Sequence, residues 1–270
     1  MRRKILIFLI CLISVFSMNA AAGGEKVAAA VRFDTPVCVT VNGNYLAMDT
    51  EPFLYEGVSF VPIRFVSEAL GADSVSWNAG QRKAVIRQGN TSIELPVGKK
   101  YAYVNGKKVA VSQGVQLVND RTYIPVRFVS ESLDCDVAWD SSSYTVEIDK
   151  PEITVPAYLI GNRGFTDDEI YWLSKIIHAE SRGEPMNGKI AVGNVVLNRV
   201  EDRQFPDSIY EVIFDRQHGV QFSPVADGSI HQTPLGDSVI AAKRALRGEE
   251  EAGESLYFLN PRIASSSWII

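Results

Sequence analysis

Apolar residues recur at helical spacing within residues 165–183, at Ile170, Leu173, Ile176 and Ile177. Intervals of three and four are typical of a helix that buries one face. Thr166 stands just before this run and Glu169 follows three residues later, which is the spacing of a capping box at a helix N-terminus. Continued by three or four residues, the stripe reaches Glu180, and Gly183 indicates the helix end. The pattern predicts a helix whose buried face finishes on a carboxylate.

Glu180 is therefore the first candidate for chemistry. Burial disfavours a carboxylate, and so does the negative C-terminal end of a helix, so we expect a raised pKa. A carboxylic acid that stays protonated near neutral pH can donate a proton to the leaving oxygen of a glycosidic bond. The alternative is a structural ion pair with Arg182 or Lys189. Glu184 lies beyond the glycine and is interpreted as a support to this turn more than as a second catalyst.

The next predicted helix, residues 186–200, is apolar around most of its circumference, which is typical of a buried helix. Asn187, Asn194 and Asn198 nevertheless fall on one stripe. Buried amides need hydrogen-bond partners. Two interpretations stay open: the amides bind neighbouring loops, or the stripe supports the Glu180 loop or faces the hydroxyl and acetamido groups of a sugar.

Shorter elements follow this helix. The pattern predicts helices over 204–214 and 236–249, the second of them capped by Asp237. Residues 218–224 are predicted to form a loop with a polar-aromatic-polar cluster, Gln221, Phe222 and Ser223. The two polar side chains can donate and accept hydrogen bonds, and the ring can stack on a sugar or pack under it.

The preceding part, residues 33–149, consists of short alternating segments that predict strands, and one unit occurs in it twice. Residues 58–77 match residues 121–139, with Phe60 aligned to Tyr123, 63 positions later. Each copy is predicted to contain strands, one short helix that begins at a proline, and further strands. One copy alone has a small core, and pairing the two buries more surface.

Together these patterns predict a multidomain chain, with a β-rich α+β tandem-repeat N-terminal domain and a mainly α C-terminal domain. The two repeats occupy about 33–95 and 96–149. Prolines and glycines indicate a linker over 150–164. The helical domain covers 165–270, and because the chain stops on apolar Trp-Ile-Ile we expect this domain to be C-terminally incomplete.

Residues 1–22 predict a signal peptide for export. Basic residues precede an apolar run at 5–16, which is shorter than the roughly 20 residues of a membrane span, and small residues at 20–22 suit cleavage. An uncleaved anchor is the alternative. After cleavage we expect a secreted protein without stable membrane insertion. Cys38 and Cys135 then remain, either as buried free thiols or as one disulfide.

Composition and charge narrow the partners. The net charge is −5 and the sequence pI about 5.4, which disfavours nucleic-acid binding because that needs a basic face. The three histidines, His178, His218 and His231, lack a zinc-binding spacing such as HExxH. We therefore predict no metal and no other cofactor.

The repeated phrases VPIRFVSEALGADSVSW and IPVRFVSESLDCDVAW resemble the copper amine oxidase N-terminal-like domain, a paired repeat of exported proteins. The resemblance covers residues 33–149. It implies an accessory role in which the repeats attach to the cell wall or to a protein partner. It does not imply copper here, because no histidine precedes His178.

The phrase IIHAESRGEPMNGKIAVGNVVLNRV, followed by QFSP and by ALRGEEEAGESLYFLNP, resembles the cell wall hydrolase or spore cortex-lytic enzyme family. The resemblance covers about residues 167–268. It implies a small, mainly helical, lysozyme-like domain that acts on peptidoglycan, with Glu180 as the catalytic acid. The family implies lytic transglycosylase chemistry on spore cortex.

We therefore expect an exported enzyme of the cell wall or spore cortex, with a part in sporulation or germination, that cuts the MurNAc–GlcNAc bond as a lytic transglycosylase. The alternatives are a hydrolytic muramidase or glucosaminidase, and a non-catalytic wall-binding surface protein. Paired-carboxylate hydrolysis needs a second acid, and Glu184, Glu201, Asp202 and Asp207 are available without a recognisable motif. The expected substrate contacts are Glu184, Asn194, Asn198, Gln221, Phe222 and Ser223.

Overall fold

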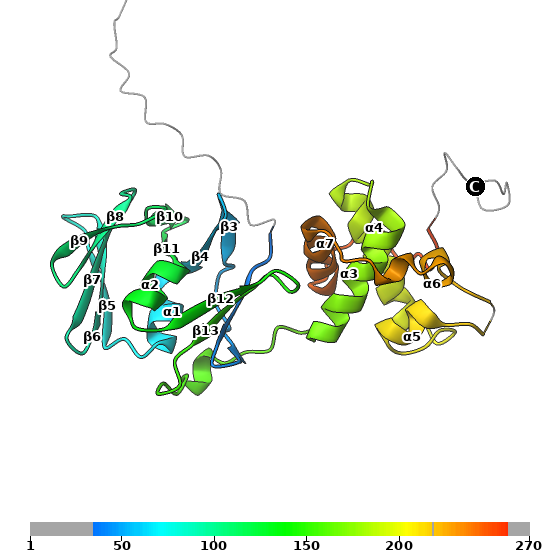
Figure 1. Ribbon diagram of the computed structural model, residues 1–270, viewed down its shortest axis with the longest axis horizontal. Coiled ribbons are helices and arrows are strands. Elements are labelled where there is room, and N and C mark those ends of the chain that lie inside the picture. The colour runs from blue at the N-terminus through cyan, green and yellow to red at the C-terminus, as the bar shows by residue number, and fades with distance from the viewer. Residues whose placement is uncertain (1–34, 218, 259–270) are drawn as a thin grey trace, which may run out of the picture. The chain divides into compact units, whose positions relative to one another are not determined.

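The computed structural model describes residues 35–217 and 219–258 (Figure 1). The predicted signal peptide, residues 1–22, and the C-terminal Trp-Ile-Ile lie outside these residues. Strands dominate up to residue 149 and helices from residue 167, so the predicted order of a β-rich part and a helical part is confirmed. Among the described residues, no helix is both long enough and apolar enough to cross a membrane.

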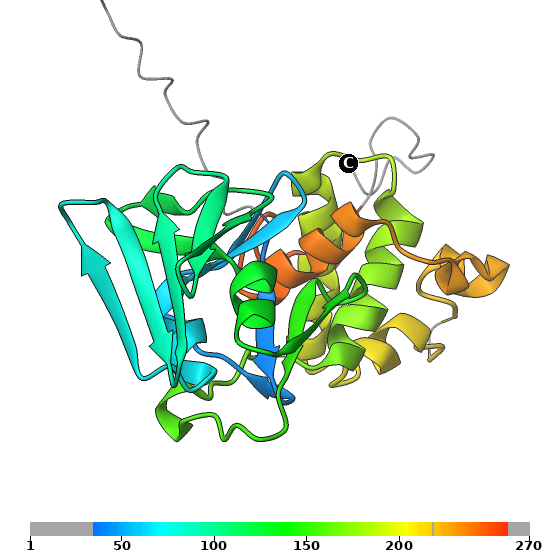
Figure 2. The same cartoon turned by 60° about the vertical axis from the view of Figure 1, so that its left-hand side comes forward.

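The β-rich part arranges its strands in three sheets (Figures 1 and 2). The strands are β1 (Cys38–Val41), β2 (Asn44–Tyr45), β3 (Phe53–Tyr55), β4 (Val58–Pro62), β5 (Ser74–Asn78), β6 (Lys83–Gln88), β7 (Thr91–Pro96), β8 (Tyr101–Val104), β9 (Lys107–Ala110), β10 (Gln116–Val118), β11 (Arg121–Pro125), β12 (Asp136–Asp140) and β13 (Thr145–Asp149). Two short helices, α1 (Ile63–Ala69) and α2 (Val126–Ser132), begin directly after prolines. The sheet orders are β12-β13-β1-β2, β10-β11-β4-β3 and β5-β6-β7-β8-β9.

Strands that are distant in sequence pair within these sheets. β1 lies parallel to β13, with Cys38 opposite Thr145, so the first and last strands of the β-rich part share a sheet. β4 and β11 pair antiparallel, with Val61 opposite Ile124. One continuous apolar core consequently draws residues from both halves of the β-rich sequence.

The segment predicted as a linker is partly packed. Val155 and Leu159 are buried in the core of the β-rich part. The Ala47 amide donates to the Leu159 carbonyl at 2.9 Å, and the short 3-10 helix η1 (Ala157–Leu159) belongs to this stretch. Residues up to about 161 therefore extend the β-rich part.

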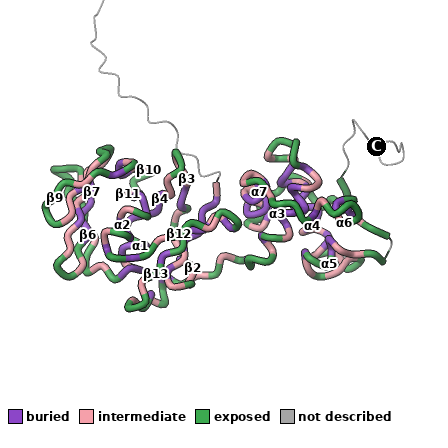
Figure 3. The backbone as a smooth tube through the Cα atoms, in the orientation of Figure 1, coloured by how far each residue is buried: buried purple, intermediate pink, exposed green. Residues whose placement is uncertain are grey.

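The helical part is built from α3 (Asp167–Ser181), α4 (Met186–Glu201), α5 (Ile209–Phe214), α6 (Ser223–Asp227), η2 (Ser229–His231) and α7 (Gly236–Leu246). The three longest helices, α3, α4 and α7, contact one another pairwise. Figure 3 shows the buried stretches of α3 and α4 in purple. Their core includes Leu173, Ile176, Ile177, Ile190 and Val196.

Local signals fix the start of α3 as predicted. The Glu169 amide donates to the Thr166 hydroxyl at 3.2 Å, and the Thr166 amide donates to the Glu169 carboxylate at 2.6 Å, which completes the capping box. Phe165 and Ile170, on either side of the cap, are both buried. The periodic stripe and the cap together account for this helix.

The helical part differs from the sequence predictions in two element boundaries and in the role of one capping residue. The helix predicted from residue 204 begins at Ile209, because Ser208 is its N-cap and accepts from the Glu211 amide. The predicted loop, residues 218–224, ends in a helix, because the short helix α6 begins at Ser223 and continues to Asp227. Asp237 is not a cap but an ion-pair partner of Lys189.

Candidate active site

Helix α3 places Glu180 at its penultimate position, where the buried stripe meets solvent. The side chain is half-buried, while Ile176 and Ile177 just before it are fully buried. Burial raises the pKa of the Glu180 carboxyl, and the nearby negative charge of Asp227 raises it further. The C-terminal end of the helix adds negative potential at the same place. These effects all favour the protonated acid.

A structural ion pair does not hold Glu180. Among the described residues no cation lies within ion-pair distance of its carboxylate. Lys189 instead pairs with Asp237, its Nζ 3.2 Å from Oδ2, and donates to the Glu184 carbonyl oxygen. The structure therefore excludes the ion pair between Glu180 and Lys189 that the sequence left open.

The turn after α3 is firmly fixed. The Ser181 hydroxyl donates to the Ile177 carbonyl at 2.6 Å, and the Glu184 amide donates to the Ser181 carbonyl at 2.9 Å. Buried Lys189 holds the turn from α4 through the Glu184 carbonyl. Glu184 itself is exposed beyond the turn. The backbone that carries Glu180 is consequently braced on its C-terminal side.

Two residues before Glu180, His178 is buried in α3. Burial lowers the pKa of His178, and the positive charge of Arg182 lowers it further, and both effects favour the neutral imidazole. Its Nδ1 lies 3.4 Å from both the Leu235 amide and the Ser238 hydroxyl. His178 thus joins α3 to the start of α7, which is a structural role.

Two asparagines of α4, Asn194 and Asn198, bind the backbone of the segment after α7, while Asn187 of the predicted stripe is exposed. Asn194 is buried, donates to the Glu249 carbonyl at 2.8 Å and accepts from the Glu251 amide at 2.9 Å. Asn198 donates to the Gly253 carbonyl at 2.7 Å. Of the two interpretations, loop binding describes these side chains. The sequence identified the stripe, but which segment it binds depends on the tertiary fold.

The predicted polar-aromatic-polar cluster separates in the structure. Phe222 is buried in the helical core, and the Arg199 guanidinium lies 5.0 Å from its ring centroid. Ser223 is exposed at the first position of α6, and Gln221 is partly exposed with its amide 3.2 Å from the Gly219 carbonyl. Phe222 therefore packs under the surface, and only the two polar side chains reach it.

Asp227 is the neighbour of Glu180 that the sequence did not single out. It ends α6, a helix that packs against α3. Its carboxylate accepts from the Ser229 amide at 2.8 Å, and hydrogen bonding by Ser229 lowers its pKa. A retained negative charge thus lies near a carboxyl whose own pKa is raised. An Asp-Gly pair such as 227–228 is typical of a turn, but no sequence pattern links it to Glu180.

Comparison with known families covers both parts of the chain. Residues 40–148 match the family described as copper amine oxidase N-terminal domain. Residues 183–270 match the family described as cell wall hydrolase. The second match begins just after Glu180, so it includes the turn and α4 but not the candidate acid itself.

Curated relatives match over a similar length. A spore cortex-lytic enzyme of Halalkalibacterium halodurans is 39% identical over 106 residues, which are 39% of this chain and 31% of that protein. The spore cortex-lytic enzyme of Bacillus cereus is also 39% identical over 106 residues, and the match covers 40% of its length. The chain thus spans about a third to two fifths of the length of these relatives.

One solved structure adds to these similarities. The catalytic domain of the germination-specific lytic transglycosylase SleB from Bacillus anthracis is 38% identical. The alignment covers 40% of this chain and 87% of that domain, with a TM-score of 0.36.

Proposed function

We propose that the chain, whose residues 40–148 match the copper amine oxidase N-terminal domain family and whose residues 183–270 match the cell wall hydrolase family, cleaves glycosidic bonds of peptidoglycan with Glu180 as the proton donor. The observation that supports this role is the half-buried carboxyl at the end of α3, with a raised pKa and no cation partner among the described residues. A structural carboxylate is usually paired or solvated, whereas a proton donor must keep its proton near neutral pH.

The first step is a proton transfer. Glu180 protonates the oxygen between N-acetylmuramic acid and N-acetylglucosamine as the bond from that oxygen to C1 of the muramic acid breaks. Burial and the charge of Asp227 keep the acid protonated to a higher pH than an ordinary glutamic acid. This protonation makes the departing sugar a neutral alcohol.

We propose the lytic transglycosylase route for the second step. The 6-hydroxyl of the muramic acid bonds to its own C1, and the Glu180 carboxylate takes the hydroxyl proton. The product is a 1,6-anhydro end, no water is consumed, and the acid is regenerated. One carboxylate suffices for this route, in keeping with the single strongly positioned acid on α3. The Bacillus anthracis protein with a similar domain is named a lytic transglycosylase.

Hydrolysis is the second candidate, and Asp227 is the reason to retain it. A paired-carboxylate glycosidase uses one group as acid and a second to activate water or to attack C1. Asp227 keeps its charge through its hydrogen bonds to Ser229 and influences Glu180 electrostatically. It supplies the second carboxylate that the sequence motifs did not identify.

Mass spectrometry of the soluble products of digested sacculi tests the proposal. We expect fragments cut at the glycosidic bond and ending in 1,6-anhydro-muramic acid. Reducing ends without anhydro species would instead establish hydrolysis. Fragments cut only within the peptides would contradict glycosidic cleavage altogether.

The remaining candidates take different roles in this proposal. Glu184, Gln221 and Ser223 are at least partly exposed and are proposed as substrate contacts. Asn194, Asn198 and Phe222 are proposed to act indirectly, by fixing the segment after α7 and the base of α6.

The location of the protein follows from its substrate. We propose a secreted enzyme that acts on the cell wall or spore cortex, since curated relatives are named spore cortex-lytic enzymes. Muramic lactam in the released fragments would identify cortex, and its absence would identify the vegetative wall.

For the β-rich domain we propose a tandem repeat whose two copies exchange strands. The bounds of β3, β4 and α1 recur 63 residues later in β10, β11 and α2. The first hairpin, β1–β2, joins the final strands β12–β13, while the corresponding hairpin β8–β9 joins β5–β6 through β7. This exchange supports a single shared core, since each copy contributes strands to the sheet of the other.

A further inference from the structure

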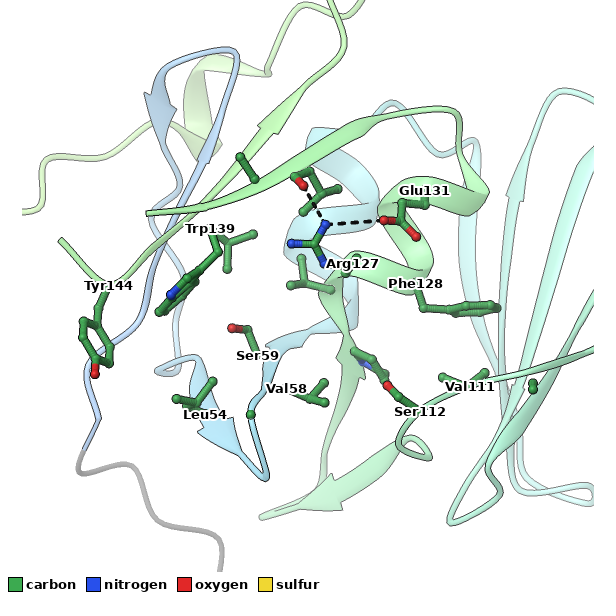
Figure 4. Close-up of a pocket in the computed structure, with 17 residues that line it drawn as sticks. Leu54, Val58, Ser59, Val111, Ser112, Arg127, Phe128, Glu131, Trp139 and Tyr144 are labelled. Atoms are coloured by element: carbon green, nitrogen blue, oxygen red, sulfur yellow. Dashed lines mark hydrogen bonds and ion pairs between the residues drawn. The ribbon is translucent and has the colours of Figure 1, made fainter. Parts of the chain in front are cut away.

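The β-rich domain contains a cavity of about 510 Å³ that the proposed catalysis does not use (Figure 4). Its walls come from both halves of the domain, namely the β3–β4 hairpin, the end of β9, helix α2 and strands β12 and β13. Its volume lies within the range of roughly 300–1,000 Å³ typical of small-molecule sites. The cavity is thus large enough for a sugar unit.

An exposed tryptophan forms part of the wall. Trp139 on β12 keeps 36% of its surface accessible. The Tyr144 ring contacts it edge to face, with centroids 5.3 Å apart and planes at 75°. Large aromatic side chains contribute to binding through their faces, and a braced ring loses little freedom when a ligand arrives. Trp139 therefore exposes an apolar ring in the cavity, and contact with Tyr144 limits the movement of this ring.

Polar groups lie opposite this surface. Arg127 donates from one terminal nitrogen to the Val137 carbonyl at 2.6 Å, and the same nitrogen lies 3.5 Å from the Glu131 carboxylate (Figure 4). Both charged side chains remain about half exposed. In the part of the chain that the structure describes, the other guanidinium nitrogens of Arg127 have no hydrogen bond. Arg127 and Glu131 together offer donors and acceptors without a net charge.

A second, smaller cavity of about 160 Å³ occupies the corresponding place in the other half of the domain. Arg64 and Trp77 line it, 63 and 62 residues before Arg127 and Trp139. Its volume is below the usual range for a ligand site. The two cavities therefore share an Arg–Trp pair but differ in capacity.

At three pairs of corresponding positions the two halves carry different residues, and these residues explain the difference in cavity volume. Asp120 and Arg121 line the smaller cavity where Gly57 and Val58 line the larger one. Arg121 also pairs with Asp49 at 2.5 Å, and the residue 63 positions after Asp49 is Ser112, which lines the larger cavity. Side chains and an ion pair therefore narrow the smaller cavity, while glycine, valine and serine leave the larger one open.

We propose that the larger cavity binds a saccharide unit of a polysaccharide, with the ring on Trp139 and its hydroxyl groups on Arg127, Glu131 and Ser59. An aromatic ring beside Arg127 and Glu131, whose opposite charges cancel, suits an uncharged sugar. An anionic polymer would instead need a positively charged surface. The assignment rests on the proposed function, because a polysaccharide substrate for the helical domain supplies the ligand class. The β-rich domain then holds the glycan that the helical domain cuts.

Binding of the full chain to purified sacculi tests this site. The chain carries Glu180→Gln throughout, so that the substrate is not consumed. Trp139→Ala should weaken binding about tenfold or more, as loss of an aromatic anchor does. Trp77→Ala, at the smaller cavity, is the matched control and should change binding less than about twofold.

A second variant keeps the test valid if Trp139→Ala does not fold. Gly57→Asp with Val58→Arg installs the residues of the smaller cavity. Gly57 has a φ of +74° and Asp120 a φ of +59°, in the left-handed region where Asp is among the better tolerated residues other than glycine. This variant should lose binding to the same degree and still unfold in one cooperative thermal transition.

Competition with soluble ligands, together with lysis assays of the chain with Glu180 intact, distinguishes failure of the saccharide site from failure of the proposed function. An oligomer of N-acetylglucosamine, which carries no peptide, should compete with sacculi for the parental protein but not for the variants. Unchanged binding by both cavity variants, or competition by free stem peptide alone, would overturn the saccharide assignment and leave the proposed function standing. Binding that depends on Trp139 in a chain that releases no glycan fragments would overturn the proposed function alone.

Discussion

At the residue scale, the chemistry depends on a carboxyl that keeps its proton. Asp227 acts electrostatically on Glu180, and the surroundings of the two acids shift their pKa values in opposite directions, upward for Glu180 by burial and downward for Asp227 by its hydrogen bonds to Ser229. Such divergence is what separates a proton donor from a permanent charge. The role of each acid follows from its surroundings more than from its residue type.

Asp227→Asn should move the pH dependence of lysis. Removing the negative charge near Glu180 lowers the pKa of that acid, so activity should fall off at a lower pH than in the parental protein. The measurement is the rate of sacculus lysis across pH.

The control for this shift is Asp202→Asn. Asp202 accepts from a backbone amide two residues on, the Gln204 amide at 2.8 Å, as Asp227 does from Ser229. The Asp202→Asn substitution should leave the pH dependence of sacculus lysis unchanged. A profile unchanged by Asp227→Asn would show that Asp227 does not act on Glu180, whereas loss of activity at every pH would favour the hydrolytic route with Asp227 as second carboxylate.

At the element scale, the site depends on the close approach of α3, α4 and α7. Gly193 on α4 makes this approach possible. A Cβ atom there would lie 3.1 Å from both Ile177 Cδ1 on α3 and Ala245 Cβ on α7. The glycine therefore has a packing role where the helix carrying Glu180 meets its two neighbours.

Gly193→Val should overpack this contact and lower the free energy of unfolding by about 1–3 kcal/mol. Ala191→Val on the half-buried side of the same helix adds the same kind of side chain where the helix has more room, and should cost less than about 1 kcal/mol. Denaturant unfolding of both variants measures the difference. Equal losses would mean that helix propensity, not packing at Gly193, decides the effect.

Sequence patterns predicted the long elements better than the short ones. The apolar stripe and the capping box predicted α3 and its end near Glu180, because the apolar residues on one face of a long helix recur at regular spacing over several turns. Helix α6 has only five residues, too few to show a helical period, so the sequence pattern predicts no helix there and does not single out Asp227. The pairing of β1 with β13 likewise depends on contacts between distant segments, and no local pattern specifies it.

At the scale of the whole molecule, the proposals assign glycan binding to the β-rich domain and glycan cleavage to the helical domain. The β-rich domain has an open cavity lined by Trp139 and Tyr144, and the helical domain has a glutamic acid whose pKa is raised by burial. The overall charge is negative, so binding to the glycan depends on shape and hydrogen bonds more than on general attraction. If both proposals hold, the joined domains raise the local concentration of substrate at Glu180.

The central claim is that Glu180 donates the proton, and sacculus lysis by Glu180→Gln tests it most directly. Glu201→Gln, at the exposed end of α4, is the matched control for loss of one helix-end carboxylate. Glu180→Gln should lower the rate of lysis by about a hundredfold or more, with unchanged unfolding, while Glu201→Gln should lyse sacculi at the parental rate. Full lytic activity in the Glu180→Gln protein would contradict the assignment.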